Sequence, residues 1–314
     1  MAYQTINGVR VWGNPDEGAL AQAKTCAEYG NVVQALLMAD HHKGYSQPIG
    51  GVVAYDGQIS PSGVGYDIGC GNKAVRTNLM ASDMKPRLSA IMDQIARKVS
   101  FGIGRANSEK VDHELFDDPD WSVYAAVGRQ EHDKLKALAR DQLGTVGSGN
   151  HYVDLFEEIG TGRLWIGNHF GSRGFGHKTA SGFLNLAAGR EFLGKAPGES
   201  MDQPPVLLDL NSELGDMYYR AMKLAGRYAY AGRDYVIKQL LSILGAEADF
   251  EVHNHHNYAW RETHEGKDVI VVRKGATPSA PGQLGFIGGS MGDISVIVRG
   301  KDTVENREAF YSTG

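Results

Sequence analysis

Four segments of the chain place small residues around a polar or chelating side chain. They are GVGYDIGCGN (63–72), LGTVGSGNHYVDL (143–155), GNHFGSRGFGH (167–177) and EVHNHHNYA (251–259). Glycine makes up 41 of the 314 residues, against a usual share of about 7%. Because glycine has no Cβ, backbone in such segments can turn tightly or approach an ion or a phosphate. Each segment could therefore contribute a ligand to a common site.

The polar side chains in these segments are of the types that bind metal ions. Asp67 and Cys70 lie three residues apart in one loop, and His151 and His169 come from two further segments. The fourth segment adds one or more of His253, His255 and His256. A carboxylate, a thiolate and several imidazoles are enough for one or two divalent ions. Thiolate and imidazole favour zinc, whereas the carboxylate and an open position for phosphate would also suit manganese.

The glycine spacings differ from those of the common nucleotide-binding loops. No segment has the spacing G-x-G-x-x-G in the required context, and none has G-x-x-x-x-G-K-[ST]. Arg173 and Arg273 lie beside glycines and could bind phosphate through their guanidinium groups. A solvated surface role is the alternative for both, because most exposed arginines have no other function.

Composition excludes several classes of protein. The net charge of −5 and the pI near 6.1 argue against a broad basic face that coats nucleic acid, although a local basic groove is compatible with them. Two cysteines are too few for a disulfide framework, and Cys26 fits a small core residue. No apolar run approaches the roughly 18 residues of a membrane span, and the first residues do not resemble a secretion signal. We therefore expect a cytoplasmic protein without a membrane role.

Sequence periodicity predicts an α+β fold in one domain. A helix is expected near 83–99, capped by Ser82 or Asp83, and a second from about 212 to 244, whose tyrosines pack in the core. Glycines could break the second helix at Gly215, Gly226 and Gly232. Strands are expected at 205–210, 268–273, 282–289 and 293–300. The close succession of the last three favours antiparallel neighbours over repeated βαβ units.

Taken together and in this order, the segments resemble the RtcB family of RNA ligases. The matching stretches are DHHKGYSQPIGGVVAYDGQISPSGVGYDIGCGNKAVRT, LGTVGSGNHYVDL, HFGSRGFGH, HHNYA and RKGATPSAPGQLGFIGGSMGDISVIVRG. The family joins a 2′,3′-cyclic phosphate or 3′-phosphate RNA end to a 5′-hydroxyl end with GTP and manganese. The resemblance implies a single RtcB-like domain over residues 1–314, with mixed and antiparallel sheets, packed helices and a metal centre in a central cleft.

The resemblance also implies site residues. Two Mn²⁺ ions would be bound by Asp67, Cys70, His151, His169 and His256, with the Cys70 thiolate bridging both ions. GTP would be contacted by Asn150, Asp154, Gly289, Ser290, Met291 and Gly292. The family usually has glutamate at the position of Asp154. The implied partners are GTP and RNA, either tRNA halves or other cleaved RNA ends.

The family's nucleophile is a histidine that becomes guanylylated, in a segment H-G-A-G-R. This segment follows a stretch resembling AFYSTG, and AFYSTG forms the last six residues of this sequence, up to Gly314. We therefore expect the catalytic histidine about one residue further on, in a C-terminal segment absent from these 314 residues, and no stable GMP adduct on these residues alone. Two alternatives are a metal-dependent RNA phosphohydrolase or nuclease with activated water, and an inactive homologue that binds RNA ends.

Overall fold

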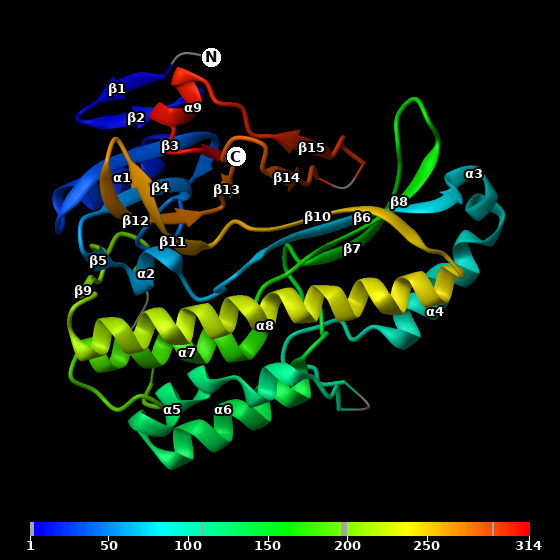
Figure 1. Cartoon of the computed structure of the whole chain (residues 1–314), viewed down its shortest axis with the longest axis horizontal. Helices are drawn as coiled ribbons and strands as arrows, with labels where there is room; N and C mark the ends of the chain where they lie inside the picture. The colour runs from blue at the N-terminus through cyan, green and yellow to red at the C-terminus, as the bar shows by residue number, and fades with distance from the viewer. Residues whose placement is uncertain (1–2, 108–109, 196–199, 291) are drawn as a thin grey trace.

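The computed structural model describes residues 3–107, 110–195, 200–290 and 292–314, and its largest sheet has six strands (Figure 1). The strand order in this sheet is β1 (Gln4–Ile6), β2 (Val9–Val11), β3 (Val32–His42), β4 (Ile49–Tyr55), β12 (Lys267–Lys274) and β11 (Tyr258–His264). Neighbours are antiparallel except β2 and β3, which are parallel and joined by α1 (Glu17–Glu28). Asp16 caps α1, because its carboxylate accepts the N–H of Ala19 at 2.8 Å.

A second, four-stranded sheet positions the polar segments. Its order is β10 (Ala248–His255), β6 (Gly71–Met80), β8 (Arg163–His169) and β7 (Tyr152–Glu157), and every neighbouring pair is antiparallel. The hairpin β14 (Leu284–Ile287) and β15 (Val296–Arg299) lies beside β10, and Phe286 donates its N–H to the Asn254 side chain at 3.0 Å. The hairpin is thereby fixed next to the second sheet.

One long helix, α8 (Glu213–Leu244), runs beneath the second sheet (Figure 1). The helix α7 (Arg173–Ala187) runs alongside α8, and α5 (Ser122–Val127) and α6 (Arg129–Gln142) lie on the side of α8 away from the sheet. The remaining described elements are α2 (Pro61–Val64), α3 (Ala81–Met84), α4 (Leu88–Lys98), α9 (Val304–Glu308), β5 (Gln58–Ile59), β9 (Leu208–Asp209), β13 (Thr277–Pro278) and β16 (Ser312–Thr313), with 3₁₀ turns at Lys85–Arg87, Glu114–Asp117 and Pro119–Trp121.

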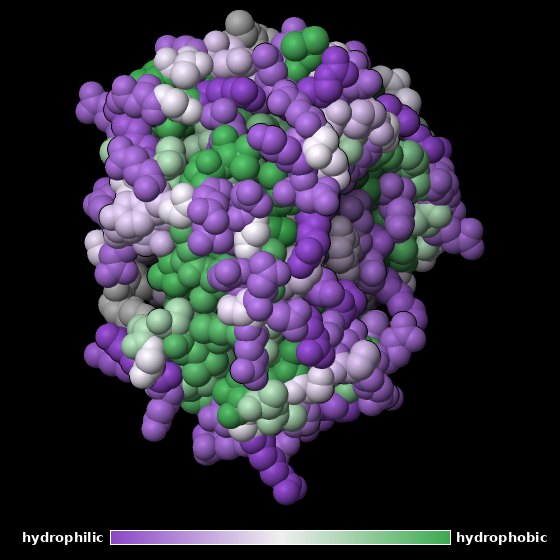
Figure 2. Space-filling view, turned by 60° about the vertical axis from the view of Figure 1, so that its left-hand side comes forward, coloured by the Kyte–Doolittle hydropathy of each residue, from purple (hydrophilic) through white to green (hydrophobic). Residues whose placement is uncertain are grey.

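Two buried clusters hold these layers together. One joins the six-stranded sheet to the helices through fully buried rings such as Tyr55, Tyr124, Phe175 and Tyr228. The other packs α4 and α8 against the second sheet, with Ile95, Val236 and Ile166 among its members. Figure 2 shows one face of the molecule, on which hydrophilic residues cover most of the surface and hydrophobic residues gather in a band between them. Among the described helices, none is sufficiently long and apolar to cross a membrane.

The long helix is continuous, contrary to the expectation that its glycines could break it. Ser212 caps it, and its oxygen accepts the N–H of Gly215 at 3.1 Å. A Cβ at Gly215 would lie 1.9 Å from the carbonyl oxygen of Asp209, and one at Gly226 would lie 2.7 Å from the ring of Tyr258. These glycines therefore allow close packing rather than ending the helix. The prediction that tyrosines of this helix fill the core is confirmed for Tyr218 and Tyr228.

The predicted helix at 83–99 is shorter than expected. Pro86 lies in a 3₁₀ turn, so α4 begins at Leu88, and neither Ser82 nor Asp83 caps it. Ile91 and Ile95 are buried as predicted, whereas Leu88 is 44% exposed. Of the expected strands, 205–210 forms only the short β9, and 268–273, 282–289 and 293–300 contain β12, β14 and β15. The predicted α+β class is confirmed.

Candidate metal centre

The five predicted metal ligands meet at one end of the four-stranded sheet. Cys70 directly precedes β6, His151 directly precedes β7, His169 ends β8 and His256 directly follows β10. In an antiparallel sheet the start of one strand lies beside the end of its neighbour, so the register brings all four positions to one edge. Asp67 reaches this edge from the loop between α2 and β6.

Two groups of candidate ligands share the thiol of Cys70. Among the described residues, Asp67, Cys70 and His151 form one group, and Cys70, His169 and His256 form the other. Within each group the ligand atoms lie within 4.8 Å of one another. Sγ of Cys70 is 3.4 Å from Nε2 of His169 and 3.7 Å from Nε2 of His151. This donor set could hold two divalent ions with the sulfur between them.

Backbone contacts hold the Asp67–Cys70 loop against the turn after β10. The carbonyl oxygen of Cys70 accepts the N–H of His256 at 2.8 Å, and Gly69 donates its N–H to the carbonyl of Asn257 at 2.8 Å. Gly69 has a φ of +71°, a conformation that glycine adopts without steric cost. The turn of this loop therefore depends on glycine, as the sequence indicated.

A hydrogen bond and a stacked ring orient His169 toward Cys70. Nδ1 of His169 lies 2.7 Å from Oδ1 of Asn72, and the Asn72 amide in turn donates to the carbonyl of Phe286 at 3.0 Å. A proton on Nδ1 of His169 leaves the Nε2 lone pair free to face the thiol. The ring of Tyr152 stacks on His169 with centroids 5.4 Å apart. Asn72 and Tyr152 therefore fix the orientation of this imidazole.

His151 has two competing neighbours at Nδ1. The carbonyl oxygen of Val146 is 3.0 Å away, and Nη1 of Arg173 is 2.9 Å away. A proton directed at Val146 leaves Nε2 of His151 free to bind a metal, whereas a hydrogen bond from Arg173 leaves the proton on Nε2, directed at Oδ2 of Asp67 at 2.9 Å. Arg173 reaches this position because Gly147 has no side chain, since a Cβ there would lie 1.9 Å from Nη2. Phosphate binding by Arg173 stays a prediction.

Burial and neighbouring charges set the protonation of the ligands. Burial alone would raise the pKa of Asp67, but the hydrogen bond and charge of His151 lower it to about 2. Burial and the Asp67 carboxylate raise the pKa of the Cys70 thiol well above its usual value. Burial lowers the pKa of His256 to about 4 and that of His169 well below its usual value. At neutral pH Asp67 is thus ionised and His256 is neutral, so metal binding would displace a proton chiefly from Cys70.

The three histidines of EVHNHHNYA have different surroundings. Only His256 joins a candidate ligand group among the described residues. Nε2 of His253 accepts a hydrogen bond from Nε of Arg233 at 2.9 Å, and Nδ1 of His255 lies 3.0 Å from Nη2 of Arg233. Arg233 is not among the residues predicted from the sequence. Its position on the buried stripe of α8, at helical spacing from Ala229, Val236 and Leu240, is the signal that could have identified it.

Arg273 has neither of the two roles considered for it. It is fully buried, and its guanidinium donates to both carboxylate oxygens of Glu262 at 2.6 and 3.0 Å. It also donates to Oγ of Ser312 and to the carbonyl of Phe310, each at 2.7 Å. The phosphate-binding and surface interpretations of Arg273 are therefore wrong, because its donors are used inside the protein.

The predicted nucleotide contacts partly converge on a cavity of about 730 Å³ beside β7. Asp154, Ser290 and Gly292 line it, together with apolar residues that include Trp165 and Phe286. Gly289 does not line this cavity, Asn150 is exposed in the turn before His151, and Met291 lies outside the described residues. Burial raises the pKa of Asp154.

Strand alternation connects this cavity to the metal ligands. Tyr152 and Asp154 are two residues apart in β7, so their side chains leave the strand on the same side. Tyr152 lies on His169, and a Cβ at Gly288 would lie 2.3 Å from the Tyr152 hydroxyl. The segment that carries Ser290 therefore begins beside a ring that contacts a candidate ligand.

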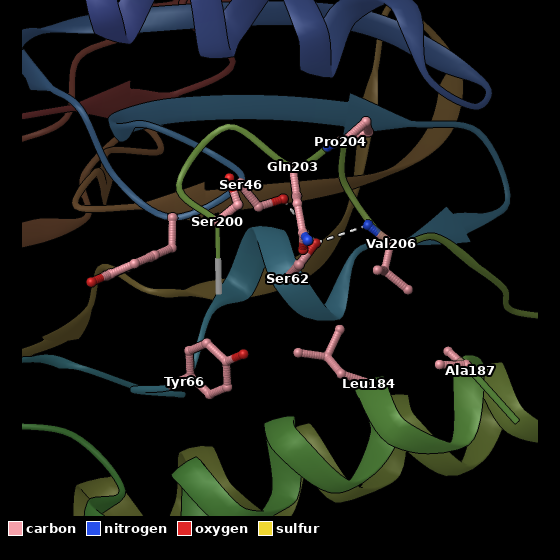
Figure 3. Close-up of a pocket in the computed structure, with 11 residues that line it drawn as sticks. Ser46, Ser62, Tyr66, Leu184, Ala187, Ser200, Gln203, Pro204 and Val206 are labelled. Carbon is pink, nitrogen blue, oxygen red and sulfur yellow. Dashed lines mark hydrogen bonds between the residues drawn. The ribbon is translucent and has the colours of Figure 1, made fainter. Parts of the chain in front are cut away.

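A second cavity, of about 190 Å³, lies between α2 and α7 (Figure 3). Tyr66 and Leu184 point into it from opposite sides, and Oγ of Ser62 accepts the N–H of Val206 at 2.9 Å. None of the described residues that line it is charged or a candidate metal ligand. The lining therefore contains no candidate ligand, although Tyr66 directly precedes Asp67 in the chain.

The fold and the site define an α+β protein with a thiolate-centred cluster of candidate metal ligands at a sheet edge. Residues 22–314 match the family model described as tRNA-splicing ligase RtcB, and the chain belongs to the RtcB family. It is 32% identical to the tRNA-splicing ligase RtcB of Thermococcus kodakarensis, over 94% of this chain and 76% of that protein. It is 33% identical to the RNA-splicing ligase RtcB of Escherichia coli K12, over 88% of this chain and 71% of that protein.

Proposed function

We propose that this protein is an RNA ligase that joins 2′,3′-cyclic phosphate or 3′-phosphate ends to 5′-hydroxyl ends, with two Mn²⁺ ions and GTP. Membership of the RtcB family supports ligation of RNA, because the relatives are named as RNA-splicing and tRNA-splicing ligases. The substrates would be tRNA halves or other cleaved RNA ends. The observation that carries the proposal is the position of Cys70 in both groups of candidate ligands.

The residues present fit a two-metal centre. Asp67 and His151 would hold one ion with Cys70, and His169 and His256 would hold the other. Asn72 directs the imidazole of His169, and Gly171 leaves room for the Asp67 carboxylate. When bound, the two ions would neutralise phosphate oxygens and promote departure of pyrophosphate.

The nucleotide would lie between this centre and the cavity beside β7. Asp154 could accept hydrogen bonds from the donors on the Watson–Crick edge of guanine, and the apolar wall would contact the base. The triphosphate would extend toward the ligand cluster, past Asn150 and Tyr152. Asn150 is exposed in the turn next to His151, where its amide could reach a phosphate oxygen.

The reaction would proceed through a histidine nucleophile that carries GMP and transfers it to the RNA 3′-phosphate. The 5′-hydroxyl would then displace GMP. Where the RNA end is a cyclic phosphate, hydrolysis would open it before GMP is transferred. By resemblance, this histidine would belong to the family's segment that follows a stretch like AFYSTG. In this chain Ser312 and Thr313 of that stretch form β16, which pairs with β13.

Ligation of defined RNA ends tests the proposal. The protein, with any residues that its gene encodes after Gly314, is incubated with a 2′,3′-cyclic phosphate RNA, a 5′-hydroxyl RNA, Mn²⁺ and GTP. Joined RNA that requires GTP and is lost in Cys70→Ala is the expected result. Arg227→Lys, on α8 but paired with Asp118 and Asp120, is the matched control and should ligate normally.

Two other outcomes would contradict ligation. Release of phosphate or shortening of RNA without GTP would identify a phosphohydrolase or nuclease. Binding of 3′-phosphate RNA that is equal in the parent protein and in Cys70→Ala, without any product, would identify an RNA-end-binding protein.

A further inference from the structure

Arg233 of α8 is fully buried, and its guanidinium bonds to both segments that carry candidate ligands. Nη1 donates to the carbonyl oxygen of Gly69 at 2.9 Å and to that of Phe170 at 2.6 Å. Gly69 directly precedes Cys70, and Phe170 directly follows His169. One side chain therefore connects the Cys70 loop to the end of β8.

Two histidines of β10 contact the other nitrogens of Arg233, although Nδ1 of His255 also lies 2.9 Å from the carbonyl oxygen of Gly69. Nε donates to Nε2 of His253 at 2.9 Å, and Nη2 lies 3.0 Å from Nδ1 of His255. The centroid of the Tyr230 ring lies 5.1 Å from the guanidinium carbon. Since the guanidinium is planar and rigid, these contacts fix its orientation as well as its position.

No direct ion pair within the described residues compensates the burial of Arg233. The ion pairs found among the described residues do not include Arg233, and the adjacent Asp234 pairs with Lys73 at 2.7 Å instead. A buried cation without a carboxylate partner carries a desolvation cost. A positive charge would also repel metal ions bound nearby. The geometry of the guanidinium is therefore the feature that favours arginine here.

We propose that Arg233 is a positioning residue of the metal centre, whose guanidinium fixes the Gly69–Cys70 segment relative to the His169–Phe170 segment. This inference rests on the proposed metal centre. It concerns the distance between Sγ of Cys70 and Nε2 of His169, which is 3.4 Å in the structure. A lysine at 233 would keep the charge but offers a compact ammonium in place of the planar fork.

Cobalt binding to the purified chain tests the inference, because Co²⁺ bound to a thiolate gives a sulfur-to-metal absorption band. The expected result is that Arg233→Lys weakens Co²⁺ affinity by about tenfold or more and alters the band, as loss of residues that orient ligands does. Arg227→Lys, the same change six positions earlier on α8, should leave both unchanged. Circular dichroism spectra, recorded after a chelator has removed bound metal, verify that each variant is folded.

Three outcomes are decisive. Unchanged Co²⁺ affinity and spectrum in folded Arg233→Lys would overturn the positioning role. Absence of the band in the parent chain would overturn the proposed metal centre instead. If Arg233→Lys fails to fold, His253→Phe removes the acceptor of Nε while keeping a ring, and it should also weaken Co²⁺ binding although His253 is in neither ligand group. Unchanged binding in His253→Phe would then count against the positioning role.

Discussion

A Cβ on Gly171 would lie 2.2 Å from Oδ1 of Asp67 and 2.8 Å from Oδ2, closer than carbon and oxygen can approach. The absence of a side chain at position 171 thus allows the Asp67 carboxylate to reach His151 and Cys70. We expect Gly171→Ala to displace the carboxylate and to reduce Mn²⁺ affinity about tenfold or more. Isothermal titration calorimetry measures this change.

Gly18→Ala is the matched control for Gly171→Ala. Gly18 lies in α1, and a Cβ there would meet chiefly the flexible side chain of Lys43 at 3.2 Å. The Mn²⁺ affinity of Gly18→Ala should equal that of the parent protein. Equal Mn²⁺ affinity in Gly171→Ala and the parent would show that Asp67 is not a ligand.

Cys70→Ala should remove binding of both ions, because both groups of candidate ligands depend on this sulfur. After equilibration with Mn²⁺, the manganese content measured by elemental analysis should fall from about two ions per chain in the parent to none in the variant. Cys26→Ala is the control, since Cys26 lies on the buried face of α1 and its thiol contacts the carbonyl of Ser46. Loss of only one ion in Cys70→Ala would contradict the bridging role.

Mn²⁺ affinity should rise with pH. The raised pKa of Cys70 keeps the thiol protonated near neutral pH, so each bound thiolate releases one proton. Asp67, with a pKa of about 2, and His256, with a pKa of about 4, have already lost their protons and do not add to the slope. Affinity should therefore increase about tenfold per pH unit between about pH 6 and 8. Calorimetry in buffers of different ionisation enthalpy counts the protons, and a count of zero would contradict a metal-bound thiolate.

Asp154→Asn should weaken binding of GTP more than that of ATP. A carboxylate accepts hydrogen bonds from guanine N1–H and N2–H, whereas adenine presents an acceptor at N1, and a hydrogen bond to a charged group contributes about 1.5–3 kcal/mol. Competition binding with a fluorescent GTP analogue measures the ratio. Glu157→Gln is the control, because Glu157 lines the same cavity but pairs with Lys85 at its exposed rim. An unchanged GTP to ATP ratio would argue against base recognition by Asp154.

Arg273→Ala should destabilise the fold without a direct effect on phosphate binding. The change leaves the carboxylate of Glu262 without its guanidinium partner and the carbonyl of Phe310 without its donor. Loss of one partner of a buried pair costs about 3–5 kcal/mol of unfolding free energy, which urea denaturation measures. Arg299→Ala, on the surface of β15, should change stability by less than about 0.5 kcal/mol. Similar stability losses in the two variants would contradict the buried role of Arg273.

The sequence predicted the types of ligand and the protein family better than it predicted how the ligand residues are positioned. Asp67 and Cys70 could be paired from their spacing in one loop, because three residues cannot separate them far. Their proximity to His151, His169 and His256 followed from the family resemblance, since no local pattern shows which strands are neighbours. The α+β class and the long helix at 212–244 were also accessible, because periodicity is a local property.

Tertiary structure decided the roles that depend on long-range contacts. His253, His255 and His256 are nearly adjacent in sequence, yet strand alternation and the turn after β10 direct two of them to Arg233 and one to Cys70. Arg273 is internal because Glu262 and the backbone at Phe310 accept its hydrogen bonds. The ring of Tyr258 occupies the space that a side chain at position 226 would need, which accounts for a glycine within a continuous helix. Local spacing determined which chemical groups this protein has available, and the antiparallel register of four strands determined which of them share a site.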